Sequence, residues 1–210
     1  MSVLGTLGPL VQGPSQHRAV RIRTSVVLGV AFVAGATTVF SLIDALSGLT
    51  GVASVPVELR VGIGAAGLLA LAAVDVRARR RSTYCPLSWR RQTPRALIRR
   101  RSATVVAAVW GFDIGLAITT MRVAAITWGA ILLAGLGLSV WFAGLAYGLG
   151  FAVPFVVLLW THRAGRLAFS PSPVDPGLES MLARRSALQA ISAVLLIGAG
   201  AALLGVTLAS

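Results

Sequence analysis

The sequence predicts an all-α fold, a polytopic transmembrane helical bundle, and three observations support that prediction. Hydrophobic residues make up 56% of the 210 residues and charged residues only 12%, whereas a typical soluble domain has about 25% charged residues. Apolar runs long enough to cross a bilayer recur along the chain. All nineteen basic residues are arginines, and nearly all of them lie between these runs. Such placement is typical of the cytoplasmic loops of membrane proteins.

The first half of the chain divides into a tail, a hairpin and a basic loop. Residues 1–23 are expected to form a cytoplasmic tail, since their arginines follow the start of the chain instead of opening a signal peptide. Residues 24–76 predict a transmembrane hairpin, with a Gly/Ser/Thr turn at residues 48–54. Residues 77–102 form an Arg-rich loop that we expect in the cytoplasm, because it holds ten of the nineteen arginines.

The second half, residues 103–209, is expected to consist of transmembrane helices with a polar, proline-rich cytoplasmic loop at residues 161–186. Residues 103–160 are almost continuously apolar and are long enough for two long spans or three short ones. Three would give six spans in all and put four arginines of the 161–186 loop outside. Two would give five spans, with the N-terminus and seventeen of the nineteen arginines inside and the C-terminus outside. Charge favours five spans, and six is the alternative.

The five-span interpretation makes residues 103–135 one element, about 50 Å long if it were a straight helix. That length exceeds the roughly 30 Å hydrocarbon core, so the element is expected to be broken or re-entrant. The polar residues Thr119 and Thr120 mark the expected break. Backbone groups freed there need partners in protein or water, because lipid offers none.

Four residues of this element form the candidate substrate or proton site: Asp113, Thr119, Thr120 and Arg122. Asp113 lies about ten residues into its apolar run, a depth at which a carboxylate is costly and faces the bundle interior. It is either a group that handles a proton or substrate, or a structural carboxylate with a neighbouring partner. Arg122 either comes closer to Asp113 through the break or extends to the outer interface.

Small residues predict close helix packing in the same half of the chain. Gly111 with Gly115, and Gly144 with Gly148, have the GxxxG spacing that lets helix backbones approach. Pro154 is expected to kink its helix.

The arginines of the central loop are expected to set topology and to contact anionic lipid heads; they include Arg77, Arg79, Arg80, Arg81, Arg90, Arg91, Arg99, Arg100 and Arg101. A net charge of +13 is also compatible with nucleic-acid binding, but the membrane-length runs argue against it. The lone Cys85 lies among these arginines, which favour a lowered pKa of its thiol, although a bystander role is expected. The sequence shows no catalytic cluster and no metal-ligand spacing, so we expect no enzyme activity, metal or cofactor.

Two segments resemble the CcdA/DsbD transmembrane family. Residues 143–155, Ala-Gly-Leu-Ala-Tyr-Gly-Leu-Gly-Phe-Ala-Val-Pro-Phe, are similar to its Tyr-x-Leu-Gly-x-x-x-Pro-Phe helix. Residues 111–121 are similar to its glycine-rich helix that ends in Thr-Pro-Cys, and residues 34–38 faintly echo the same feature. The final span, after Arg184 and Arg185, also fits that family's last helix.

The resemblance covers about half of the chain and departs from the family at its reactive centre. That family carries electrons across the membrane through a cysteine pair, and the matching positions here are Thr120-Met121 and Thr38-Val39. The resemblance therefore implies a shortened relative without thiol chemistry, or a transporter of the wider LysE-like superfamily.

We therefore expect a non-catalytic integral protein of the bacterial cytoplasmic membrane, a subunit or assembly partner of a membrane complex. Its expected partners are a bilayer with anionic lipid heads and another protein or further copies of this chain. The alternative is a small-solute or ion transporter that uses an intramembrane carboxylate.

Overall fold

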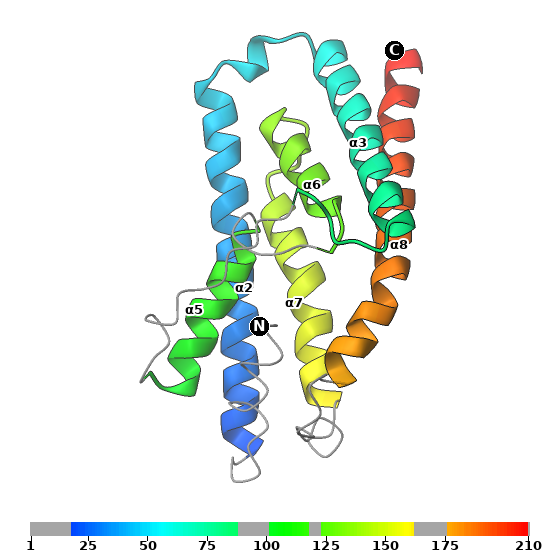
Figure 1. Cartoon of the computed structure of the whole chain (residues 1–210). Helices are drawn as coiled ribbons and strands as arrows, with labels where there is room; N and C mark the ends of the chain where they lie inside the picture. Colours follow the sequence, from blue (N-terminus) through cyan, green and yellow to red (C-terminus); the bar gives the residue numbers. More distant parts are fainter. Residues whose placement is uncertain (1–17, 88–100, 118–122, 162–175, 210) are drawn as a thin grey trace. The chain divides into compact units, whose positions relative to one another are not determined.

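The protein is all-helical in the residues described by its computed structural model, which are 18–87, 101–117, 123–161 and 176–209 (Figure 1). In chain order the α-helices are α2 (Arg18–Leu49), α3 (Val57–Arg80), α5 (Ala103–Gly115), α6 (Ile126–Gly135), α7 (Ala143–Thr161) and α8 (Pro176–Ala209), and a short 3-10 helix, η1 (Val52–Ser54), joins α2 to α3. Within these residues three helical stretches are long and apolar enough to cross a membrane: Ile22–Leu49, Val57–Arg80 and Arg184–Val206. The protein is therefore compatible with a membrane-embedded bundle.

The helices extend beyond the apolar runs that predicted them. Helix α2 begins at Arg18, inside the predicted tail, and α3 ends at Arg80, inside the predicted loop. Helix α8 begins at Pro176, ten residues before the predicted end of the 161–186 loop. Arginine has a high helix propensity and its long side chain can reach water, so a basic segment continues a helix past the apolar boundary.

The element predicted for residues 103–135 is interrupted. Helix α5 has 13 residues and α6 has 10, about 20 Å and 15 Å of helix, so each is shorter than a bilayer core. Helix α5 starts at an N-cap, Ser102, whose side chain accepts from Val105 N, and it ends before Ala117, which has a positive φ of 63°. The predicted break residues Thr119 and Thr120 lie outside the described residues.

The chain divides into two compact units built from non-contiguous segments. The first unit comprises Met1–Thr38, Arg91–Thr120 and Gly144–Ala183, and the second comprises Val39–Arg90, Met121–Ala143 and Arg184–Ser210. Each unit thus combines segments that are distant from one another in the sequence.

The first unit packs the beginning of α2 against α5 and α7. Leu28 of α2 is buried with Val106, Ala107 and Trp110 of α5. On the α7 side, the ring of Phe32 stacks with those of Tyr147 and Phe151 at centroid distances of 6.5 and 6.2 Å. Aliphatic and aromatic contacts thus join these three helices.

The second unit packs α3 against α6 and α8. Its buried core contains Leu68 and Ala72 of α3, Cys85 and Ala125 of connecting segments, and Ala193 and Leu196 of α8. A Cβ added at Gly129 of α6 would lie 2.6 Å from Leu196 and 3.0 Å from Leu68. Glycine therefore allows α6 to fit closely against both long helices.

Candidate functional site: a buried carboxylate at the start of a short helix

Asp75 of α3 is fully buried, with 0% of its surface exposed. The backbone N–H of Ala125 donates to both of its carboxylate oxygens, at 2.9 and 3.0 Å. Ser192 of α8 donates its hydroxyl to Oδ2 at 2.5 Å. One carboxylate therefore joins α3, α6 and α8 within the second unit.

The position of Ala125 explains why a carboxylate fits there. Ala125 is the N-cap residue of α6, and its own side chain makes no cap hydrogen bond. The first N–H groups of a helix have no intrahelical acceptor and carry the positive end of the helix dipole. Asp75 supplies from a neighbouring helix an acceptor for the N-cap N–H, which is the role of the N3 Glu in a capping box, and it adds a negative charge at the helix start.

Gln189 extends this polar cluster along α8. It lies three residues before Ser192 and therefore on the same helix face, and its exposed fraction is 0%. Its Nε2 donates to the carbonyls of Thr83 and Val123, at 2.9 and 3.1 Å. Its Oε1 is buried and has no hydrogen-bond partner among the described residues. Gln189 thus ties the segments that follow α3 and precede α6 to α8.

The other end of α6 is held by Arg60, which also belongs to α3. Gly137, with a φ of 63°, follows the C-cap residue Leu136. The bonds from Gly137 N to Ala134 O and from Leu138 N to Leu133 O form a Schellman motif. Arg60 donates Nη1 to the Leu136 carbonyl at 3.2 Å. A positive charge therefore lies at the negative end of the α6 dipole.

Cys85 lies in the core of the same unit, with 2% of its surface exposed. Burial raises the pKa of the Cys85 thiol, the backbone hydrogen bond with Leu87 opposes this shift, and the charge of Asp75 adds to it. The expectation that neighbouring arginines lower this pKa is wrong, because loss of water around the thiolate is the largest effect.

The predicted substrate or proton site is described only at Asp113. Asp113 lies on α5 in the first unit, is half-buried, and has a partner. Thr119, Thr120 and Arg122 lie outside the described residues. The most buried carboxylate that the structure describes is Asp75, which the sequence analysis did not single out. The available signal was the pair Gln189 and Ser192, two polar residues on one face of an apolar helix.

Three of the four glycines predicted for helix packing, Gly111, Gly115 and Gly148, lie where a neighbouring helix backbone approaches closely. A Cβ at Gly111 or Gly115 would overlap the carbonyl oxygens of Leu28 and Phe32, respectively, in α2. A Cβ at Gly148 would lie 2.9 Å from the Cα of Val33. Gly144 is buried in α7, which also contains Pro154.

The arginines of the central loop are described only at its two ends. Arg77, Arg79 and Arg80 lie in the last turns of α3, Arg81 is its C-cap, and all four are exposed. Arg101 is exposed just before α5, and Arg90, Arg91, Arg99 and Arg100 lie outside the described residues.

Comparisons with protein-family models, with curated proteins and with solved structures found no match for this chain. Among the described residues, no group of three or more His, Cys, Asp or Glu side chains could hold a metal ion. Functional inference therefore depends on the geometry of the chain itself.

Proposed function

We propose that this chain is a non-catalytic integral membrane protein that serves as a subunit or assembly partner of a membrane complex. The observation that carries the proposal is the arrangement around Asp75. Its oxygens accept hydrogen bonds from Ala125 and Ser192, and the carboxylate is fully buried. A carboxylate engaged in this way stabilises a helix end, which is a structural task, whereas a transport site must exchange its partners for substrate.

The topology that we propose has five spans, with the N-terminus in the cytoplasm and the C-terminus outside. It is supported by two contacts within the second unit. Arg79, at the end of α3, donates Nε to the Ser186 hydroxyl of α8 at 3.0 Å. The Arg185 guanidinium lies 5.5 Å from the centre of the Tyr84 ring. Arg185 and Ser186 of α8 thus lie beside the end of α3. This proximity supports placing the central and late basic loops on one side of the membrane.

The direction of α6 supports a single crossing for residues 103–135. Gly64 of α3 faces Leu133 and Gly67 faces Leu132, while Asp75 binds Ala125. Helix α6 therefore runs antiparallel to α3, from the side of the basic loops toward the other side. We propose that α5 and α6 together make one interrupted crossing, that α7 returns, and that α8 crosses last.

Reporter fusions test this topology. Alkaline phosphatase fused after Ser210 should be active and a green fluorescent protein there should be dark, if the organism exports proteins across its cytoplasmic membrane. The same pair of reporters fused within residues 162–175 should give the opposite pattern. A fluorescent fusion at Ser210 would contradict the five-span topology and favour six.

Residue-specific photo-crosslinking tests the subunit proposal. A photoreactive amino acid at the exposed Val194 or Leu195 of α8 should give one discrete adduct in native membranes, and purification in mild detergent should retain the same protein at fixed stoichiometry. The buried Ala193 provides the matched control position, because a group there faces the core. A chain that purifies alone and gives no adduct at any exposed helix face would contradict a subunit role.

A second candidate is a small-solute or ion transporter, in line with the resemblance to the CcdA/LysE-like superfamily. The interruption between α5 and α6 favours it, since discontinuous helices line the sites of many transporters. In proteoliposomes, a transporter should lose flux in Asp113→Asn while the variant still folds. Under the subunit proposal, the same variant should keep its protein partner.

A further inference from the structure

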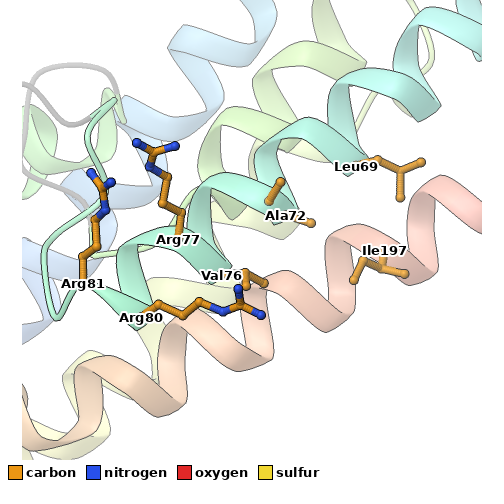
Figure 2. Close-up of a pocket in the computed structure, with 8 residues that line it drawn as sticks. Leu69, Ala72, Val76, Arg77, Arg80, Arg81 and Ile197 are labelled. Atoms are coloured by element: carbon orange, nitrogen blue, oxygen red, sulfur yellow. The ribbon is translucent and has the colours of Figure 1, made fainter.

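The second unit contains an open groove of about 690 Å³ between α3 and α8. Its apolar part is formed by Leu69, Ala72, Ala73 and Val76 of α3 and by Ile197 of α8. Three arginines, Arg77, Arg80 and Arg81, line its remaining end. Figure 2 shows the Arg80 side chain extending from α3 toward α8, with Leu69 and Ile197 farther along the two helices.

The length of the groove matches one leaflet of a bilayer. Leu69 and Arg80 are separated by eleven residues of α3, about 16 Å along the helix. Half of a hydrocarbon core of roughly 30 Å is about 15 Å. With Arg80 at the interface, the apolar part of the groove reaches about as deep as the end of an acyl chain. Leu69, Val76 and Ile197 are 41%, 37% and 47% exposed, so the surface is open to a ligand.

The positive charge at one end of the groove indicates which class of ligand it would bind. The last two turns of α3 carry arginines, whereas Asp75, the acidic residue of this part of the helix, is buried in the core and bound to Ala125 and Ser192. The arginine end thus presents positive charge to the membrane interface. A guanidinium group can bind a phosphate with two parallel N–H donors.

We propose that this groove binds one anionic phospholipid of the cytoplasmic leaflet, with an acyl chain along Leu69, Val76 and Ile197 and the phosphate at Arg80. The Arg80 side chain points toward α8, whereas those of Arg77 and Arg81 point away from it (Figure 2). This assignment depends on the membrane orientation in the proposed function, but not on the subunit role. A lipid held between α3 and α8 would also stabilise their packing beside Asp75.

The test uses the full chain in detergent, with lipid binding followed by native mass spectrometry. Phosphatidylglycerol should bind at one saturable site, more tightly than phosphatidylcholine of the same chains. The variant Arg80→Gln should weaken phosphatidylglycerol binding about fivefold, given the usual contribution of about 1 kcal/mol from one arginine near anionic lipid. The matched control Arg101→Gln removes the same charge from an exposed position that does not line the groove, and should bind as the unmodified chain does.

A second pair of variants separates the groove from charge alone. Ala73→Phe fills the groove and keeps every arginine, so it should also weaken binding of phosphatidylglycerol at least tenfold. Ala70→Phe, at an exposed α3 position outside the groove, should leave it unchanged. Thermal unfolding in the same detergent checks that all four variants fold.

Three outcomes would overturn the proposal. They are equal loss of binding in Arg80→Gln and Arg101→Gln, equal affinity for the two lipids, and full competition by millimolar inorganic phosphate, which would indicate a free-phosphate site. A failed subunit experiment leaves these outcomes unaffected, because they need no protein partner.

Discussion

Replacing Asp75 with alanine should destabilise the protein by about 3 kcal/mol. The change removes the acceptor of two buried donors, the Ala125 N–H and the Ser192 hydroxyl. Leaving a buried donor without a partner costs roughly 1–3 kcal/mol, and losing an N-cap acceptor costs about 1 kcal/mol in many helices. The serine hydroxyl can rotate to another acceptor, so its cost lies at the low end of that range. Asp75→Asn keeps the shape and one oxygen, so we expect a loss of about 1 kcal/mol.

A denaturant titration in mixed micelles measures the free energy of unfolding, and hydrogen exchange shows which amides lose protection. Exchange should quicken first at the amides of the first turn of α6, since these lose their cap. Asp44→Ala provides the control, because Asp44 is an exposed acidic residue of α2 and its loss should leave stability unchanged. A change below about 0.5 kcal/mol for Asp75→Ala, or an equal loss in the control, would refute the capping role.

The remaining predictions concern other parts of the two units. Gly111→Ala should lower the unfolding free energy by about 1–3 kcal/mol, since the new Cβ overlaps a backbone carbonyl, whereas Gly150→Ala, which has open space, should be neutral in the same titration. Arg60→Gln should destabilise the second unit by about 1 kcal/mol, because the Leu136 carbonyl loses a charged donor; urea or detergent titration measures this loss. Cys85 should react with maleimide slowly at pH 7 and faster as the pH rises toward the raised pKa of its thiol. It should react rapidly once the protein is unfolded, and fast labelling of the folded chain would contradict its burial.

Sequence patterns predicted the helical class and the interruption between residues 103 and 135. The length of an apolar run can be counted in the sequence and compared with the thickness of a bilayer core. The GxxxG pair Gly111 and Gly115 was also readable, since its spacing aligns two missing side chains on one helix face. The burial of Asp75 could not be predicted from the sequence in the same way. Asp75 lies two residues before Arg77, at the basic end of an apolar run, which is also where a carboxylate at the membrane interface would lie. Its burial depends on α6 and α8 meeting at that point, which is a tertiary property.

Asp75 and Arg60 of α3 each bind one end of α6. These contacts explain the positions of the two charges on α3 better than a location at the membrane interface does. A short helix in an apolar environment leaves unpaired N–H groups at one end and unpaired carbonyls at the other, and lipid can satisfy neither. Asp75 and Arg60 lie fifteen residues apart on α3, about 22 Å, and bind the two ends of an antiparallel helix, at Ala125 and Leu136, that are about 16 Å apart. The long Arg60 side chain spans the difference. The sign of each charge opposes the α6 dipole, and exchanging the two would place like charges at both ends.

The double exchange Arg60→Asp/Asp75→Arg should therefore be more destabilising than the sum of Arg60→Ala and Asp75→Ala, although it preserves the net charge. Unfolding of these three variants in mixed micelles tests this expectation, and a loss for the double exchange no larger than the sum would contradict the pairing of these two residues with α6.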